Sequence, residues 1–273
     1  MRAPRVDRLA AIALVAMALA PAPAARAQAT AQPIAARPTA AWARVPFGVG
    51  ERLVYDVRFG ALKVGSGSME VLGTALLRGR EVYHTSFRVK GGTFFYKVHD
   101  VYESWFDVRS LASLRHRQDK DEGRYERLRT FEIFPERAVF RENDKPEQPS
   151  VDQPLDDGSF LYFVRTIPLV EGETYTFDRY FRPDRNPVTI RVLRRERVTV
   201  PAGTFDAVVV QPIIKTKGIF GEGGHAEVWL ADDASRMILQ LKSELKIGSL
   251  NLYLREYRLP TRMPGEVTES IPR

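Results

Sequence analysis

Apolar and polar residues alternate along most of this chain, and this period of two constrains the fold more than any other feature. In the segment 51–59, Leu53, Tyr55, Val57 and Phe59 occupy every second position. Alternation of this kind is typical of a β-strand that buries one face. Such segments follow one another at short intervals without intervening helices, so we expect a largely antiparallel sheet.

Further segments with the same alternation cover most of the chain between residues 80 and 260. Turn-forming residues separate many of them, as in Pro201-Ala202-Gly203 and Gly248-Ser249. Gly65 and Gly67 lie two apart on one face of the second predicted strand, which permits a sharp bend or close packing of another backbone. The further predicted strands are 81–89, 124–134, 173–182, 187–200, 205–217, 225–231, 236–247 and 249–258.

One segment departs from this pattern and predicts a short amphipathic helix over 155–166. Phe160, Phe163 and Ile167 recur at helical spacing, acidic residues precede them and Pro168 follows. The Pro-rich stretch 146–154 before it is a candidate domain boundary, but a single helix that plugs one side of a curled sheet is the simpler arrangement. The expected fold is therefore mainly β: a curved antiparallel sheet or open β-barrel with one short helix packed on or in it.

The N-terminal residues 1–27 have the features of a cleaved signal peptide. Three arginines lie within the first eight residues, Leu9 to Ala20 is a continuous apolar stretch, and Ala25-Arg26-Ala27 fits the small-x-small rule for cleavage before Gln28. The apolar stretch is 12 residues long, whereas a membrane-spanning helix needs about 20. We therefore expect export and, for a Gram-negative source, a periplasmic location, or an extracellular one otherwise.

The remaining sequence divides into a flexible leader (28–45), a single β-rich domain (46–260) and a polar tail (261–273). The whole chain has a formal charge of +7, but the predicted signal peptide carries +3 of it. The expected compartment alone argues against a nucleic-acid partner. Two arginine-rich stretches, 111–129 and 178–197, are interpreted as solvated strand faces, with anionic lipid headgroups or acidic polymers as the alternative.

Several short motifs, in order, resemble a bacterial family known as domain of unknown function 3108. The motifs are 47–55 (FGVGERLVY), 63–67 (KVGSG), 101–104 (VYES), 200–205 (VPAGTF) and 228–230 (VWL). The resemblance spans roughly 47–259. It implies an exported protein without an assigned activity, so no catalytic residues can be transferred from it.

No recognisable catalytic or metal-binding motif occurs in the sequence. The chain contains no cysteine, which excludes disulfides and thiolate chemistry. His99, Asp100 and Ser104 could be combined into a triad, but adjacent strand residues point to opposite faces. His225 and Glu227, beside Glu222, supply too few ligands for zinc. We therefore expect no catalytic residues, no metal and no cofactor.

The aromatic residues are the most informative candidates for a binding function. A curved sheet that holds a helix encloses either a filled core or an apolar cavity, and both have the same alternation. If there is a cavity, a lipid or other hydrophobic ligand is expected. The residues proposed to line it are Phe95, Tyr102, Trp105, Phe160, Phe163 and Trp229.

Three hypotheses follow. The first is a non-enzymatic periplasmic binding or carrier protein for a hydrophobic or amphiphilic cell-envelope component, or for an envelope protein partner. The second is an envelope hydrolase whose site is assembled from distant strands, and the third is a structural accessory of the outer envelope. An integral outer-membrane barrel is disfavoured, because many strand faces carry arginines and the chain ends in Ile-Pro-Arg.

Overall fold

The computed structural model describes residues 45–93, 96–122, 125–214, 225–244 and 249–260. The predicted signal peptide, nearly all of the predicted leader and the predicted tail lie outside these ranges. The described part contains one α-helix, α1 (Asp157–Val164), and two short 3-10 helices, Pro135–Arg137 and Pro183–Arg185. Its strands are β1 (Arg52–Phe59), β2 (Leu62–Leu77), β3 (Arg80–Thr93), β4 (Tyr96–Asp107), β5 (Ser113–Glu122), β6 (Tyr125–Phe134), β7 (Val139–Glu142), β8 (Gln148–Pro149), β9 (Thr174–Phe177), β10 (Val188–Val200), β11 (Gly203–Ile213), β12 (His225–Ala231), β13 (Ile238–Glu244) and β14 (Ser249–Arg258).

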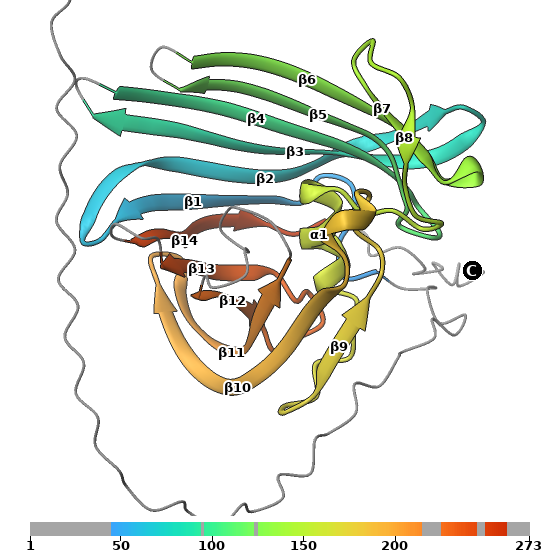
Figure 1. The fold of residues 1–273 in the computed structure, drawn as a ribbon. Coiled ribbons are helices and arrows are strands. Elements are labelled where there is room, and N and C mark those ends of the chain that lie inside the picture. The colour runs from blue at the N-terminus through green and yellow to red at the C-terminus, as the bar shows by residue number, and fades with distance from the viewer. Residues whose placement is uncertain (1–44, 94–95, 123–124, 215–224, 245–248, 261–273) are drawn as a thin grey trace, which may run out of the picture. The chain divides into compact units, whose positions relative to one another are not determined.

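All fourteen strands belong to one antiparallel sheet that does not close on itself. Their order is β8-β7-β6-β5-β4-β3-β2-β1-β14-β13-β12-β11-β10-β9, so β8 and β9 form the two edges. Every neighbouring pair is consecutive in sequence except β1 and β14, where Arg52 lies opposite Arg258. Figure 1 shows the sheet curving so that α1 lies between strands β2 to β6 and strands β10 to β14. The expected mainly-β, open and curved architecture is confirmed.

The predicted strands form largely where the alternation places them. In β1, Leu53, Tyr55 and Val57 are buried on the face that packs against α1, which we call the inner face. The predicted strand 173–182 is shorter in the structure, ending at Phe177. The residues after it form a turn in which Asn186 bonds both the backbone N–H and the carbonyl of Tyr180. These side-chain bonds replace ladder bonds, which explains the early end of the strand.

The glycines of β2 allow a close approach of two backbones, as expected from the sequence. Gly65 lies opposite Gly91 of β3. A Cβ atom on Gly65 would overlap the carbonyl oxygen of Lys90, and one on Gly91 would overlap that of Val64. At Gly67 a Cβ would make only ordinary contacts. The requirement for glycine is therefore strict at the Gly65–Gly91 pair and weaker at Gly67.

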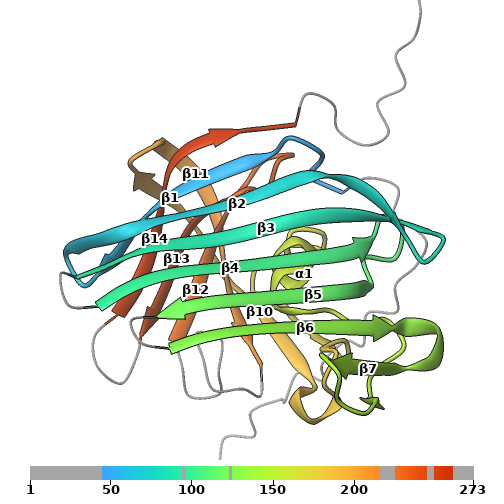
Figure 2. The same cartoon turned by 90° about the horizontal axis from the view of Figure 1, so that it is seen from above.

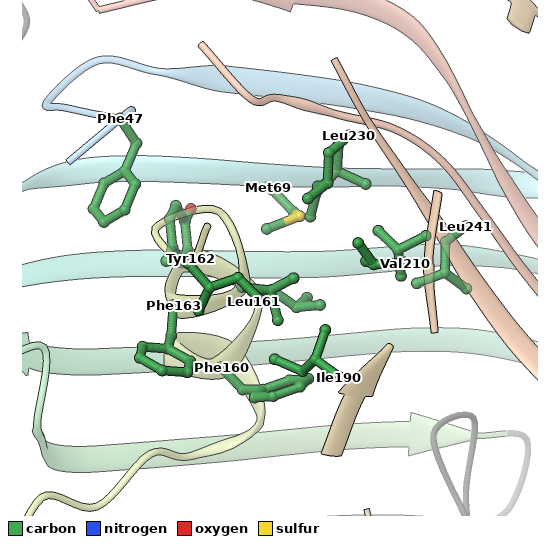
Figure 3. Close-up of a cluster of buried hydrophobic side chains, with 14 of the residues drawn as sticks. Phe47, Met69, Phe160, Leu161, Tyr162, Phe163, Ile190, Val210, Leu230 and Leu241 are labelled. Atoms are coloured by element: carbon green, nitrogen blue, oxygen red, sulfur yellow. The ribbon is translucent and has the colours of Figure 1, made fainter. Parts of the chain in front are cut away.

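The predicted helix is confirmed, but it is not amphipathic. All residues from Ser159 to Val164 are buried, because the sheet encloses α1 on more than one side. From above, strands β3 to β5 lie over the helix (Figure 2). From the other side, Val210, Leu230 and Leu241 project toward it, as Figure 3 shows. The helix is thus the centre of one hydrophobic core to which both halves of the sheet contribute.

Among the described residues, no helix combines the length and apolar character needed to cross a bilayer.

Candidate functional site

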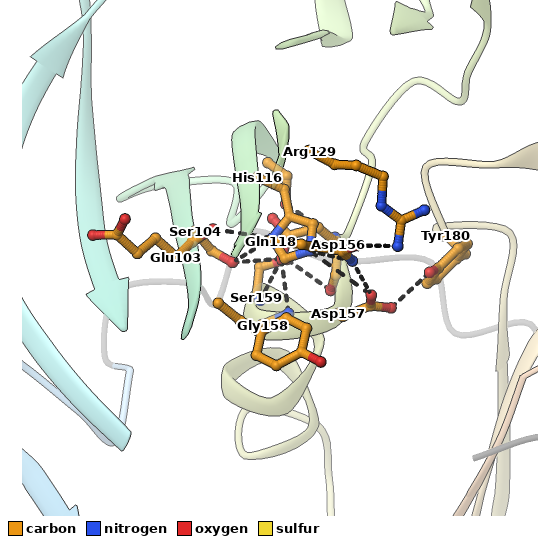
Figure 4. Close-up of polar contacts among 12 residues, drawn as sticks. Glu103, Ser104, His116, Gln118, Arg129, Asp156, Asp157, Gly158, Ser159 and Tyr180 are labelled. Atoms are coloured by element: carbon orange, nitrogen blue, oxygen red, sulfur yellow. Dashed lines mark hydrogen bonds and ion pairs between the residues drawn. The ribbon is translucent and has the colours of Figure 1, made fainter. Parts of the chain in front are cut away.

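A buried polar cluster joins the N-terminus of α1 to strands β4 and β5 (Figure 4). Asp156 is the N-cap residue, and its Oδ1 accepts hydrogen bonds from the backbone N–H groups of Gly158 (2.8 Å) and Ser159 (3.0 Å). Ser104 of β4 donates a third bond to this oxygen at 2.6 Å. These bonds satisfy backbone donors that a helix start leaves free, and they attach the helix to the sheet.

His116 of β5 belongs to this cluster, and its side chain has no solvent exposure. Its Nδ1 lies 3.0 Å from the carbonyl oxygen of Glu103 and 3.5 Å from Oδ1 of Asp156. Its Nε2 lies 3.0 Å from the side-chain amide nitrogen of Gln118, which also donates to Asp157 at 3.0 Å. The imidazole is therefore held on both nitrogens and faces two carboxylates.

These neighbours change the proton affinities of the cluster. Burial lowers the pKa of His116, but the charges of Asp156 and Asp157 and a hydrogen bond to Asp157 outweigh burial, so the net pKa is raised. Partial desolvation raises the pKa of Asp157, whose side chain is 45% exposed, but His116 and a 2.6 Å hydrogen bond from Tyr180 lower it to about 2. The cluster therefore favours a charged Asp157 next to a protonatable imidazole.

Ser104, His116 and Asp156 contain the residue types of a hydrolase triad, but their geometry does not fit one. In a triad the serine and the aspartate bind opposite nitrogens of the imidazole. Here the Ser104 hydroxyl, at 3.3 Å, and the Asp156 carboxylate both approach Nδ1, and Gln118 faces Nε2. Ser104 is also only 1% exposed. The arrangement explains helix capping rather than nucleophilic attack.

The other catalytic or metal-binding candidates considered from the sequence do not come together in the structure. His99 is exposed whereas its neighbour Asp100 is buried, consistent with side chains on opposite strand faces. Glu227 bonds Arg194, and Glu222 lies outside the described residues. Within the ranges that the structure describes, no three histidine or acidic side chains gather as metal ligands would.

Beside the polar cluster, the inner face carries an apolar strip of four half-buried side chains: Phe87, Val89, Val98 and Tyr102. Phe87 and Tyr102 pair across β3 and β4 and, with residues of α1, border a hollow of about 10 Å³. A volume of this size is near the minimum for one water molecule. The core next to the helix is thus almost filled, and the exposed apolar surface lies further along the strands.

One charged residue lies within the apolar strip: Asp100 is between Val98 and Tyr102 on β4 and directly opposite Val89, and it is buried. The Tyr102 hydroxyl donates to Asp100 at 3.1 Å, and the Lys120 ammonium group lies 5.6 Å from the centre of the Tyr102 ring. Burial raises the pKa of Tyr102 to about 12, although Lys120 opposes this effect. An apolar surface with a few fixed polar groups is the usual composition of a binding site for a small amphiphile.

The predicted lining residues occupy different places. Tyr102 belongs to the apolar strip, and Phe160 and Phe163 are buried in α1. Trp105 points to the opposite face of β4, where its ring stacks on the His84 ring with 4.3 Å between the ring centres. Trp229 lies on the opposite face of β12 from Val228 and Leu230, and its ring nitrogen donates to Glu196.

Phe95 lies outside the described residues. The structure thus brings Tyr102, Phe160 and Phe163 to the inner face and core. Trp105 lies on the outer face, and Trp229, on the other face of β12, is buried at the edge of the same core cluster.

His116, Asp156 and Gln118 are not among the site residues predicted from the sequence. Asp156 could have been found, because Asp156 and Ser159 are spaced as the two halves of a capping box, and both reciprocal bonds are present. His116 had no such signal, since its partners come from strands and loops up to 41 residues away.

The fold and these two features define a class: an open, β-barrel-like domain with a buried helix and an apolar strip on its inner face. The chain belongs to the family described as "Protein of unknown function (DUF3108)", whose model matches residues 54–255. No curated protein matches the chain.

The solved structures that are similar to the chain include the following two. One is a β-barrel-like protein of domain of unknown function DUF1849 from Brucella abortus, with a TM-score of 0.54 and 12% sequence identity. The similarity covers 78% of this chain and 99% of that one, and it supports the fold. The other, named "a putative lipoprotein" from Parabacteroides distasonis, has a TM-score of 0.34 at 11% identity and covers 79% of this chain and 99% of that one.

Proposed function

We propose that the protein is a non-enzymatic binding or carrier protein that holds a hydrophobic or amphiphilic component of the cell envelope on its inner face. The observation that carries this proposal is the apolar strip. Phe87, Val89, Val98 and Tyr102 remain half-buried on the inner face of a sheet that does not close. This apolar surface is partly exposed next to a filled core. A ligand that covers it is stabilised by about 25 cal/mol for each Å² of apolar surface removed from water.

The polar groups beside the strip favour an amphiphilic ligand over a purely apolar one. Asp100 and Lys120 are 3.8 Å apart, and both lie next to Tyr102. A ligand with an apolar chain along the strip would place a polar headgroup next to this pair of charged side chains. The same contacts would orient the ligand on the strip.

Export is part of this proposal and rests on the N-terminal sequence. The basic start, the 12-residue apolar stretch and the small-x-small cleavage site of residues 1–27 support secretion. In a Gram-negative cell the mature chain would then meet the lipids and lipoproteins of the periplasm. A hydrolase is less well supported, because Ser104 and His116 are used in capping α1 and are enclosed.

The first experiment asks whether the protein carries a ligand. Protein purified under native conditions from an envelope-containing host is extracted with organic solvent and analysed by mass spectrometry. We expect a stoichiometric lipid or other amphiphile. Protein that is repeatedly empty, and that also fails to bind a fluorescent fatty-acid probe, would contradict the proposal.

A matched pair of variants locates the site. Val89 and Val101 are both half-buried and lie on neighbouring strands, but Val89 is on the inner face and Val101 on the outer face. We expect Val89→Asn to weaken binding of the probe by about tenfold, because it places an amide in the apolar strip. Val101→Asn should bind the probe as the unmodified protein does. Equal effects of the two substitutions would place the ligand elsewhere.

A further inference from the structure

The hairpin between β1 and β2 exposes two large apolar side chains at its tip. Phe59 is 43% exposed and Leu62 is 71% exposed, and they lie directly opposite each other across the hairpin. Gly60 and Ala61 between them are also exposed. Exposed phenylalanine and leucine at one turn give a small apolar projection with little polar surface of its own.

The tip lies on the same face of the sheet as the apolar strip. Phe59 continues the inner-face alternation of Tyr55 and Val57, and its pairing places Leu62 beside it. Between the tip and the strip lie Gly65 and Gly91, which have no side chains and approach each other closely. The inner face therefore has a continuous apolar path from α1 to the hairpin tip, and exposure increases along it.

Basic residues predominate in the two chain segments nearest this tip. The hairpin segment 57–66 and the neighbouring β3–β4 segment 88–99 contain no aspartate or glutamate. Figure 1 shows the ends of β1 to β4 at the same end of the sheet. Lys63 is paired with Asp56 at 2.7 Å, whereas Lys90 and Lys97 are exposed. The cations of the two segments are Arg58, Lys63, Arg88, Lys90 and Lys97.

We propose that this tip, Phe59 to Leu62 with the nearby cations Arg58, Lys63, Lys90 and Lys97, docks the protein on an anionic bilayer surface. Phe59 and Leu62 insert among the lipid chains, and the cations contact the headgroups. Insertion of a few apolar side chains and attraction of each cation to an anionic surface contribute together to interfacial binding. The inference rests on the proposed function, because docking there would present the apolar path to the membrane in which the ligand resides.

A bilayer fits the tip better than a protein partner does. A stable protein interface buries about 800 Å² on each partner, which a four-residue turn does not supply. An interfacial membrane contact needs no complementary surface, only apolar side chains at the front and cations behind them. Trp, Phe and Leu on an exposed projection with basic flanks are the residue types that meet this requirement.

The test is co-flotation of the purified chain with vesicles. The probes are vesicles of phosphatidylcholine alone and vesicles with about 30% phosphatidylglycerol. We expect binding to the anionic vesicles, at least about tenfold weaker binding to the neutral ones, and loss of binding in high salt. Equal binding to both vesicle types, or binding to neither, would overturn the proposal.

The decisive comparison uses two double variants. Phe59→Ser with Leu62→Ser removes the tip, and Leu72→Ser with Leu76→Ser removes two leucines that are 38% and 77% exposed further along β2. We expect about a tenfold loss of binding to anionic vesicles for the tip variant and none for the other. Circular dichroism checks that both variants fold. An equal loss in both variants would show that general surface hydrophobicity is responsible.

A charge-matched pair tests the cations. Lys90→Gln with Lys97→Gln removes two charges near the tip, whereas Arg109→Gln with Arg197→Gln removes two exposed charges elsewhere. Only the first pair should weaken binding to anionic vesicles. If charge variants abolish binding while the tip variant binds normally, the tip does not insert and the partner is an anionic polymer or protein.

The fatty-acid probe separates this inference from the proposed function. Vesicle binding without probe binding would remove the carrier function and keep the docking surface. Probe binding without vesicle binding would do the reverse.

Discussion

At the scale of single residues, His116 has the most altered environment. It is fully enclosed, and it lies between Asp156, the N-cap of α1, and Asp157, the first residue of the helix. Its protonation therefore affects how firmly the helix start is attached to β4 and β5. The sequence could not reveal this role, because the histidine acts through residues of a distant turn.

The stability of the protein should depend on pH through His116. The pKa of His116 is raised above its usual value of 6.5 in the folded protein. The resulting stabilisation is fully present below pH 6.5 and is lost as the pH rises through the higher folded value. We expect the free energy of unfolding in urea to fall across this range, and His116→Gln to lack that fall.

Asp157 provides the complementary check at acid pH. Its pKa is lowered to about 2 from 3.8, so its stabilising contribution is present above 3.8 and is lost as the pH falls through 2. Asp157→Asn should remove this acid-side loss and also reduce the effect of His116. A pH profile that is the same in wild type and both variants would show that the cluster is not coupled to folding.

At the scale of elements, α1 is fixed at both ends by polar groups. At its C-terminus, Arg165 is completely buried and forms a bidentate ion pair with Glu51, at 2.7 and 2.9 Å. It also donates to the carbonyl oxygens of Pro46 (2.9 Å) and Ser235 (2.8 Å). One guanidinium group thus links the helix end, the segment before β1 and the turn before β13.

Breaking this pair should be costly, whereas replacing both partners should not. We expect Glu51→Leu or Arg165→Met alone to lower the free energy of unfolding by about 3–5 kcal/mol, because each leaves an unpaired buried charge. The double variant Glu51→Leu with Arg165→Met should recover much of this loss. Urea unfolding of all four proteins measures the coupling. Single variants within about 1 kcal/mol of wild type would contradict the expectation.

Most of the elements could be predicted, and the reason is physical. Alternation reports a half-buried strand directly, so the segments that form β1, β6, β10, β12 and β14 are predicted with bounds close to those observed, whereas β3 extends four residues past the predicted end. Helical spacing of Phe160 and Phe163 identified α1. Its burial on all sides could not be predicted, because the enclosing strands come from both halves of the sheet.

At the scale of the whole molecule, the sequence did not reveal which aromatic residues share one face of the sheet. Tyr102 and Trp105 are three residues apart on β4, and an odd separation on a strand places them on opposite faces. Sequence clustering therefore grouped residues that the sheet separates. The mainly-β class and the open sheet could be predicted from the alternation of apolar and polar residues alone. Which residues meet on the inner face depends on the register of the strands, which the alternation does not give.

Processing at the predicted site is a property of the complete chain. We expect the mature protein to begin at Gln28, because Ala25-Arg26-Ala27 precedes it after the apolar stretch. Intact-mass measurement of protein from the periplasmic fraction gives the mature N-terminus directly. Replacing Ala27 with a bulky residue such as Trp should leave the precursor uncleaved. A mature chain retaining residues 1–27 would refute cleavage.

The pairing of the first strand with the last has a consequence for how the chain could be rearranged. The ends of the sheet-forming region lie side by side at β1 and β14, and β8 and β9 are not paired with each other. A circular permutant that links residue 260 to residue 45 and opens the chain between β8 and β9 would run from β9 to β14 and then from β1 to β8. In that order every strand would pair with its successor, which turns a sheet interrupted at its centre into an unbroken meander.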